Sequence, residues 1–180
     1  MNGPNFLTLG RILAIPILVV VLLSNFRGKE LVAFFIFVLA VLTDMLDGFW
    51  ARRKKKITPL GELLDPTADK LLIASALICL VELGTVNAWM VVIIIGREIA
   101  VTGFRAIASS KGISIHASVL GKIKMNAEGI TIALLILGKG HLGSFYIIPQ
   151  IGLWIIIAVA LLSATEYYIK FGPKVISKSS

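Results

Sequence analysis

The sequence predicts an all-α, polytopic membrane protein with six transmembrane helices, and three observations support this prediction. Hydrophobic residues make up 57% of the 180 residues and charged residues only 16%, whereas soluble domains contain about 45–50% and about 25%. The apolar residues form continuous runs that do not alternate with polar residues, which favours helices over strands. Short connections that contain glycine, asparagine or proline as helix breakers, among them Gly84–Asn87, separate the runs.

Each of the six apolar runs is close to the length of a membrane-spanning helix. Charged residues interrupt several of them before the roughly 20 apolar residues of an uninterrupted span are reached. We therefore expect helices that carry polar ends into the protein interior. The chain shows neither a repeat nor a low-complexity linker, so one domain over residues 1–180 is expected. The predicted spans are Leu7–Ser24, Leu31–Arg52, Gly61–Leu83, Val86–Ser109, Leu120–Leu137 and Tyr146–Tyr167.

The distribution of positive charge predicts how the chain is oriented. With six spans, both termini lie on one side of the membrane. That side receives all 18 lysines and arginines except Arg27, Lys29 and Lys139, and the positive-inside rule makes it cytoplasmic. The net charge of +8 then indicates an anionic membrane surface or a phosphate-bearing substrate rather than a nucleic acid.

Four aspartates near the cytoplasmic ends of the second and third spans form the strongest functional signal. Spacings of three and four residues place each pair on one helix face, and the basic turn between the spans allows the two faces to oppose. Helix-end residues that merely face water are the alternative. Four opposed carboxylates repel one another unless cations neutralise them, and ligation by oxygen alone suits Mg²⁺ or Mn²⁺. Two such cations about 4 Å apart are typical of phosphoryl-transfer sites. The aspartates are Asp44, Asp47, Asp65 and Asp69.

Small residues and an arginine continue the acidic face of the second span. Gly48 and Ala51 leave this face nearly bare, which admits either a flat ligand or a close helix contact. Arg52 follows and is suited to bidentate contact with phosphate. A phosphate ligand beside the aspartates is therefore expected.

A second basic set indicates an anion pocket on the cytoplasmic side. Arg97 interrupts an apolar run, so we expect it to face the protein interior and to pair with Glu98 or with an anion. A structural ion pair is the alternative for Arg97, and exposed loop charges are the alternative for the others. The set is Arg97, Arg105, Lys122 and Lys124.

Several common catalytic motifs are missing from the sequence. It contains no P-loop, no glycine-rich dinucleotide fingerprint and no serine elbow. Direct displacement by an activated hydroxyl is therefore simpler than covalent catalysis. The single cysteine, Cys79, lies in an apolar run and is expected to be a packing residue.

Residues 44–69 read D-x2-D-G-x2-A-R-x8-G-x3-D-x3-D, which resembles the signature of the CDP-alcohol phosphatidyltransferase family in every position and spacing. Three further segments are similar to the bacterial members that use glycerol 3-phosphate as the acceptor. These segments are Pro4-Asn5-x2-Thr8-x2-Arg11, Arg97-Glu98-Ile99 and Gly121-Lys122-x-Lys124.

The resemblance implies six transmembrane helices, a short amphipathic N-terminal segment and a homodimer. It implies two divalent cations, Mg²⁺ or Mn²⁺, one held by Asp44, Asp47 and Asp65. The other would be held by Asp44, Asp65 and Asp69, and Asp69 would also be the catalytic base. CDP-diacylglycerol would be bound by Asn5, Thr8, Gly48, Ala51, Arg52 and Thr58. The acceptor phosphate would be bound by Arg97, Arg105, Lys122 and Lys124.

The resemblance implies transfer of a phosphatidyl group from CDP-diacylglycerol to glycerol 3-phosphate in the cytoplasmic membrane, with release of CMP. Serine, an inositol phosphate or phosphatidylglycerol are alternative acceptors. An ion-coupled transporter is an alternative from another class, but it should break its helices at acids near the membrane midplane.

Overall fold

The computed structural model describes residues 3–54, 59–110, 112 and 119–177 of the chain. Within these ranges, the side chains of 3–9, 44–54, 59–66, 119–124, 167 and 170–177 lie outside the description. The described residues form α-helices and one short 3₁₀ helix, and they contain no strand. The elements are α1 (Gly3–Leu23), α2 (Lys29–Lys54), α3 (Pro59–Glu82), α4 (Ala88–Ser110), α5 (Val119–Leu142), η1 (Gly143–Tyr146) and α6 (Ile147–Ser177).

The all-helical prediction is confirmed, and each predicted span coincides with one α-helix. By length and hydropathy, one stretch of the described residues, Met125–Glu166, is long and apolar enough to cross a membrane, and Gly10–Leu23 is a shorter apolar helix. The number of membrane spans therefore remains a prediction from the sequence. Helix α1 runs without interruption from Gly3, and the predicted amphipathic character of its first residues lies outside the described side chains.

A left-handed glycine ends α3, at one of the breakers that the sequence indicated. Gly84 has a φ of 68°, a conformation that glycine adopts at little cost. Its N–H donates to the carbonyl of Val81 at 2.9 Å, and the N–H of Thr85 donates to the carbonyl of Leu80 at 2.9 Å. This pair of bonds is the Schellman motif, which satisfies carbonyls at the helix end.

The chain divides into two compact units, and each is described separately. Unit 1 comprises Met1–Val86 and Ile132–Tyr146, and unit 2 comprises Asn87–Thr131 and Ile147–Ser180. Non-helical backbone at Gly138, with φ 67° and ψ 175°, interrupts α5 in its unit 1 portion. The expectation of a single domain over 1–180 stays a prediction.

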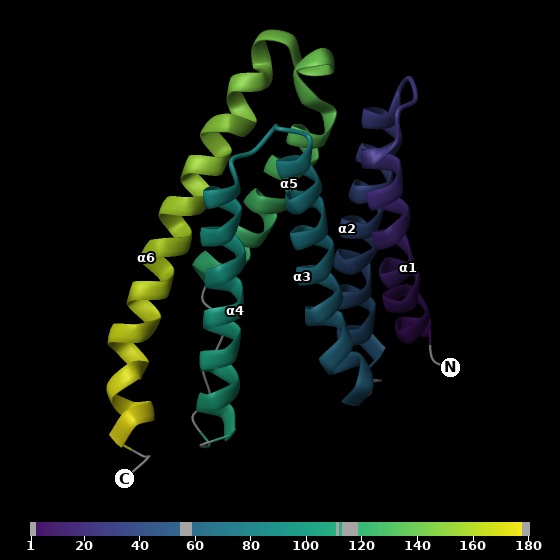
Figure 1. Cartoon of the computed structure of the whole chain (residues 1–180). Coiled ribbons are helices and arrows are strands. Elements are labelled where there is room, and N and C mark those ends of the chain that lie inside the picture. The colour runs from purple at the N-terminus through teal and green to yellow at the C-terminus, as the bar shows by residue number, and fades with distance from the viewer. Residues whose placement is uncertain (1–2, 55–58, 111, 113–118, 178–180) are drawn as a thin grey trace. The chain divides into compact units, whose positions relative to one another are not determined.

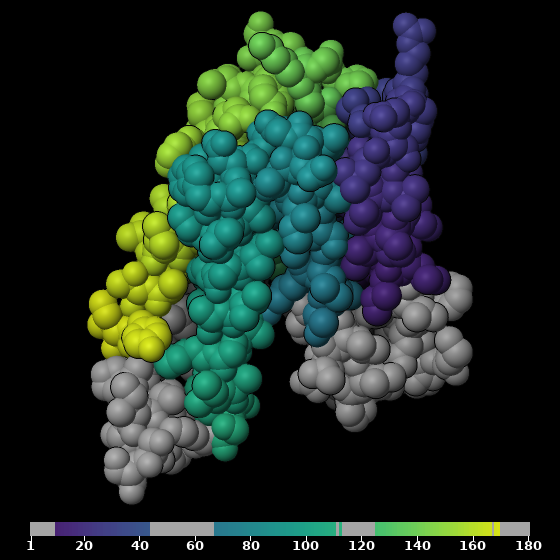
Figure 2. Space-filling view, in the orientation of Figure 1, coloured from purple at the N-terminus to yellow at the C-terminus, as the bar shows by residue number. Residues whose placement is uncertain are grey.

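In unit 1, α1 packs on both α2 and α3, and α2 also contacts α3 (Figure 1). The surfaces of α1 and α2 meet along the purple part of the chain in Figure 2. The buried core residues of these helices include Leu18 and Leu22 of α1, Phe37 of α2, and Leu72 and Leu77 of α3, all at most 2% exposed. Interlocked aliphatic and aromatic side chains thus hold α1 against both neighbours.

In unit 2, α4 packs on α6 (Figure 1). Two aromatic pairs join these helices: Trp89 with Trp154 and Phe104 with Tyr168, each with ring centroids 5.7 Å apart. Such pairs add about 0.5–1.5 kcal/mol each beyond the apolar area that they bury. The contact therefore extends along most of α4.

Large apolar side chains also cover the outer faces of the helices. Val20, Phe35, Val92 and Leu162 are 65%, 59%, 69% and 72% exposed. A helix that is apolar on all sides is typical of a membrane protein. This agrees with the class that the composition predicts.

Unit 2 contains one very close helix contact, between Gly152 of α6 and Thr131 of α5. A Cβ atom added at Gly152 would lie 2.6 Å from Oγ1 and 2.9 Å from Cγ2 of Thr131. Overpacking of this kind costs about 1–3 kcal/mol. We expect Gly152→Ala to lower the thermal unfolding midpoint in detergent, and Thr131→Ala to restore it in the double variant.

Gly103→Ala is the matched control, because nothing lies within 4 Å of the added Cβ atom. It should leave the midpoint unchanged or raise it, since alanine favours helix over glycine. An equal effect of the two substitutions, or no recovery in the double variant, would contradict the proposed clash.

Candidate active site

Asp69 is the one predicted cation ligand whose side chain the structure describes, and it lies in a salt bridge. Arg11 Nη1 of α1 donates to Asp69 Oδ1 of α3 at 2.9 Å. Arg11 Nε also donates to the carbonyl of Ala40 in α2 at 3.3 Å. The Arg11 side chain is 1% exposed and that of Asp69 is 28% exposed. One buried guanidinium therefore ties together the three packed helices of unit 1.

The other three predicted ligands lie on described helices, although their side chains lie outside the description. Asp44 and Asp47 are on α2, and Asp65 is on α3 with Asp69. Both helices continue without a break through the acids, so the spacings of three and four residues do place each pair on one face. At about 1.5 Å per residue, Asp44 is about 15 Å from the C-terminal end of α2 and Asp69 about 15 Å from the start of α3.

This arrangement bears on two of the alternatives. The acids lie about two to three turns inside their helices, and Asp69 pairs with a buried arginine, so Asp69 is not a helix-end residue that merely faces water. The unbroken α2 and α3 also differ from the interrupted helices that a transporter would show at its ion site. Both observations favour a carboxylate site on packed helices.

Among the residues whose side chains are described, no three histidine, cysteine, aspartate or glutamate side chains cluster closely enough to hold a metal ion. Asp44, Asp47 and Asp65 lie outside that set, so the predicted cation site is untested.

The residues predicted to bind CDP-diacylglycerol are placed only by their backbone. Asn5 and Thr8 are on α1. Thr8 lies three residues before Arg11, on the same helix face. Gly48, Ala51 and Arg52 are on α2, whereas Thr58 lies outside the described residues. Their role stays a prediction.

Arg97, in the predicted acceptor set, has protein partners within unit 2. Its Nη1 donates to Glu98 Oε1 at 2.7 Å, and its Nη2 donates to the hydroxyl of Ser163 on α6. The side chain is 11% exposed. The predicted pairing with Glu98 is therefore confirmed, and the contact with α6 gives Arg97 a structural role.

The rest of the acceptor set also belongs to unit 2. Arg105 is exposed on α4, about two turns beyond Arg97. Lys122 and Lys124 are on the first turn and a half of α5, with side chains outside the description. Binding of an acceptor phosphate by these residues stays a prediction.

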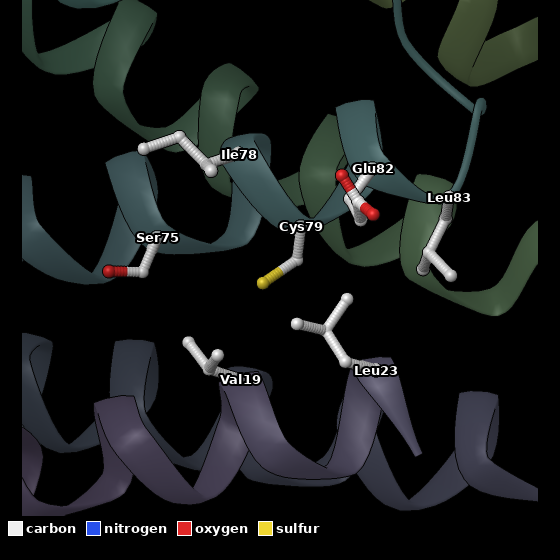
Figure 3. Close-up of a pocket in the computed structure, with 7 residues that line it drawn as sticks. All are labelled: Val19, Leu23, Ser75, Ile78, Cys79, Glu82 and Leu83. Carbon is white, nitrogen blue, oxygen red and sulfur yellow. The ribbon is translucent and has the colours of Figure 1, made fainter. Parts of the chain in front are cut away.

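A groove between α1 and α3 lies away from the predicted site. It has a volume of about 540 Å³ and is lined by Val19, Leu23, Ser75, Ile78, Cys79, Glu82 and Leu83 (Figure 3). Ser75 is about 9 Å along α3 from Asp69, and none of the predicted site residues lines the groove. Cys79 is 4% exposed and points toward α1, which confirms its prediction as a packing residue.

Sequence reasoning assigned no role to Arg11 or Ser163. Arg11 had a detectable signal, because an arginine within an apolar helix has to find a partner. Ser163 had none, since its contact with Arg97 depends on the packing of α4 on α6.

Comparison with known proteins identifies the family. A profile of the CDP-alcohol phosphatidyltransferases matches residues 1–163. The chain belongs to this family. Its members are membrane enzymes that generally depend on divalent metal ions.

Three relatives carry the name CDP-diacylglycerol–glycerol-3-phosphate 3-phosphatidyltransferase. The protein from Bacillus subtilis (strain 168) is 38% identical in an alignment 185 positions long, which covers 94% of each chain. That from Rickettsia felis is 33% identical over 169 residues, or 93% of each chain. That from Salmonella choleraesuis is 38% identical over 141 residues, or 75% of this chain and 76% of its own.

Proposed function

We propose that this protein transfers the phosphatidyl group of CDP-diacylglycerol to glycerol 3-phosphate, giving phosphatidylglycerophosphate and CMP. The observation that carries the proposal is the similarity, over more than nine-tenths of the chain, to relatives named for this reaction. The placement of the acidic signature on two unbroken, packed helices supports it. The basic set in unit 2 favours an acceptor that bears a phosphate.

The chemistry of the donor set fits hard divalent cations. The four aspartates offer only oxygen donors, as Mg²⁺ and Mn²⁺ prefer. Asp69 is held in place and is partly exposed, so its carboxylate is accessible. We propose that Asp44, Asp47 and Asp65 hold one cation, and that Asp44, Asp65 and Asp69 hold the other. If bound there, such cations would supply positive charge to the pyrophosphate and would make its phosphorus more electrophilic.

The protein's residues then have the following roles in the reaction. The residues predicted for CDP-diacylglycerol orient the nucleotide, and the basic set binds the acceptor phosphate. Asp69 accepts the proton of the glycerol 3-phosphate 1-hydroxyl. The hydroxyl oxygen forms a bond to the lipid-linked phosphorus, and the bond from this phosphorus to the CMP oxygen breaks. CMP leaves with the electron pair of that bond.

We propose further that the six helices span the cytoplasmic membrane, with both termini and the active site on the cytoplasmic side. The distribution of lysine and arginine supports this orientation. We also propose a homodimer, as the family resemblance implies.

The acceptor is tested by offering four alcohols in parallel to the purified protein in detergent with CDP-diacylglycerol. Glycerol 3-phosphate should give CMP release, and serine, an inositol phosphate and phosphatidylglycerol should not. Release with another acceptor alone would replace the assignment within the same family. No release with any acceptor would contradict the transferase proposal.

Activity should require a divalent cation, because four convergent carboxylates repel one another without one. EDTA should abolish turnover, and Mg²⁺ or Mn²⁺ should restore it. Asp44→Asn and Asp65→Asn should be the most damaging single changes, since each residue is assigned to both cations. Full turnover in chelator would contradict the two-cation proposal.

Acceptor affinity should reside in the basic set of unit 2. A hydrogen bond to a charged group contributes about 1.5–3 kcal/mol, so losing one donor should weaken acceptor binding about 10- to 100-fold. Arg105→Ala or Lys124→Ala should therefore raise the KM for glycerol 3-phosphate by that factor. The KM for CDP-diacylglycerol should change little.

Arg27→Ala is a suitable control, because Arg27 is exposed in the connection between α1 and α2. Steady-state kinetics with each substrate varied in turn measures both constants. If Arg105→Ala affects both substrates equally, or neither, these residues do not bind the acceptor.

A further inference from the structure

Arg11 is the most completely buried charged side chain among those that the structure describes, and it contacts all three packed helices of unit 1. We propose that Arg11 is a positioning residue for Asp69: it fixes the Asp69 carboxylate relative to α1 and α2 as well as to its own helix. This inference rests on the proposed function, in which Asp69 binds a cation and accepts the proton.

The burial of the guanidinium is the first reason for this assignment. At 1% side-chain exposure, Arg11 has no solvent to replace a lost partner, and breaking a buried ion pair leaves an uncompensated charge. Its Nε is also held by the carbonyl of Ala40, which is part of the backbone of α2. The guanidinium is therefore anchored to the backbone of α2 as well as to Asp69 Oδ1, and this second contact opposes its movement with the Asp69 side chain.

The neighbourhood of Asp69 is the second reason. Three further aspartates lie on α2 and α3 and are predicted to converge with Asp69, and like charges repel. An aspartate side chain that was held only by its own helix would change rotamer as cations and substrate enter and leave. Both partners of the salt bridge belong to unit 1. The contact with Arg11 can therefore hold the Asp69 side chain while cations and substrate bind and leave.

The position of Arg11 on α1 gives the salt bridge a second consequence. Thr8 lies one turn earlier on the same face, and it is predicted to contact the nucleotide. The pair between Arg11 and Asp69 therefore sets the register between the nucleotide-binding face of α1 and the reacting carboxylate on α3. A shift of about 1 Å between such groups can reduce a rate about 100-fold.

Arginine is suited to this role in a way that lysine is not. Its planar group donates from Nε to one partner and from Nη1 to another in a fixed geometry. Lysine at this position would keep the charge and could reach Asp69, but one ammonium group would have to replace both contacts. Arg11→Lys should therefore restore part of what Arg11→Gln loses.

The test compares full-length Arg11→Gln, Arg11→Lys and Asp69→Asn, and the Arg11→Gln/Asp69→Asn double variant, in detergent. Arg11→Gln should lower kcat about 100-fold, while its KM for CDP-diacylglycerol stays within about threefold of the native value. The kcat of Arg11→Lys should lie between those of Arg11→Gln and the native protein. Arg27→Gln is the control for loss of one positive charge at an exposed position, and it should match the native kcat.

Binding of Mn²⁺, followed by electron paramagnetic resonance of the free ion, provides a readout that does not depend on turnover. Loss of a residue that orients a metal ligand typically weakens metal binding about 10- to 100-fold. We expect Arg11→Gln to weaken Mn²⁺ binding in the native background, and to change it less than about twofold in the Asp69→Asn background. If Arg11→Gln binds Mn²⁺ more tightly, or changes Mn²⁺ binding equally in both backgrounds, Arg11 acts by its charge on the whole cluster of aspartates. Either result overturns the proposal.

The remaining outcomes separate this inference from the proposed function. If Asp69→Asn keeps the native kcat and the native affinity for Mn²⁺, the role proposed for Asp69 itself is contradicted. An inactive Asp69→Asn together with native kcat in both Arg11 variants would overturn only the positioning role. If Arg11→Gln does not fold, Arg11→Lys carries the same test, because it keeps the buried charge.

Discussion

A charge inside an apolar helix has to be paired, and this requirement organises the polar interior of both units. In unit 1 the buried Arg11 lies against Asp69 and the Ala40 carbonyl. In unit 2 Arg97 lies against Glu98 and Ser163. Unpaired, either guanidinium would carry a desolvation cost of several kcal/mol. Each arginine therefore determines where a neighbouring helix can lie, in addition to any part that it takes in the reaction.

The two arginines illustrate a difference between a structural and a positioning ion pair. The partner of Arg97 is its own chain neighbour, Glu98, so that pair places no distant carboxylate. The partner of Arg11 is 58 residues away and is one of the four signature aspartates. Removing Arg97 should loosen the contact between α4 and α6, whereas removing Arg11 takes the buried partner from one of the signature aspartates.

The sequence was sufficient for those features that depend on local chain properties. Continuous apolar runs located the six α-helices of the described residues, since burial of apolar faces decides where helices form. Gly84 was recognised as a breaker, and the structure shows why, since it has a positive φ and completes a helix cap. Arg97 was expected to pair with Glu98 or with an anion because it interrupts an apolar run, and the structure shows the pair with Glu98. The spacings of the aspartates gave the faces of α2 and α3, because both helices are continuous.

Features that depend on packing between distant segments could not be predicted in this way. Ser163 is 66 residues from Arg97, and nothing in its own surroundings distinguishes it from other serines in apolar helices. The close contact between Gly152 and Thr131 likewise depends on how α6 meets α5. Arg11 is an intermediate case. Its place in an apolar run indicates that it needs a polar partner, but the sequence does not tell which of the aspartates this is. The packing of α1 on α3 makes Asp69 the partner.

The predicted substrate contacts divide between the two units of the chain. The signature aspartates and the predicted nucleotide contacts come from residues before Thr85, in unit 1, whereas the predicted acceptor set comes from α4 and the start of α5, in unit 2. Both described hydrogen-bond partners of Arg11, Asp69 and the carbonyl of Ala40, belong to unit 1. A substitution in the proposed acceptor set of unit 2 therefore removes neither of them. If the proposed function holds, the choice of glycerol 3-phosphate depends on Arg97, Arg105, Lys122 and Lys124 in unit 2. The transfer itself then depends on the four aspartates and on the arginine that pairs with one of them.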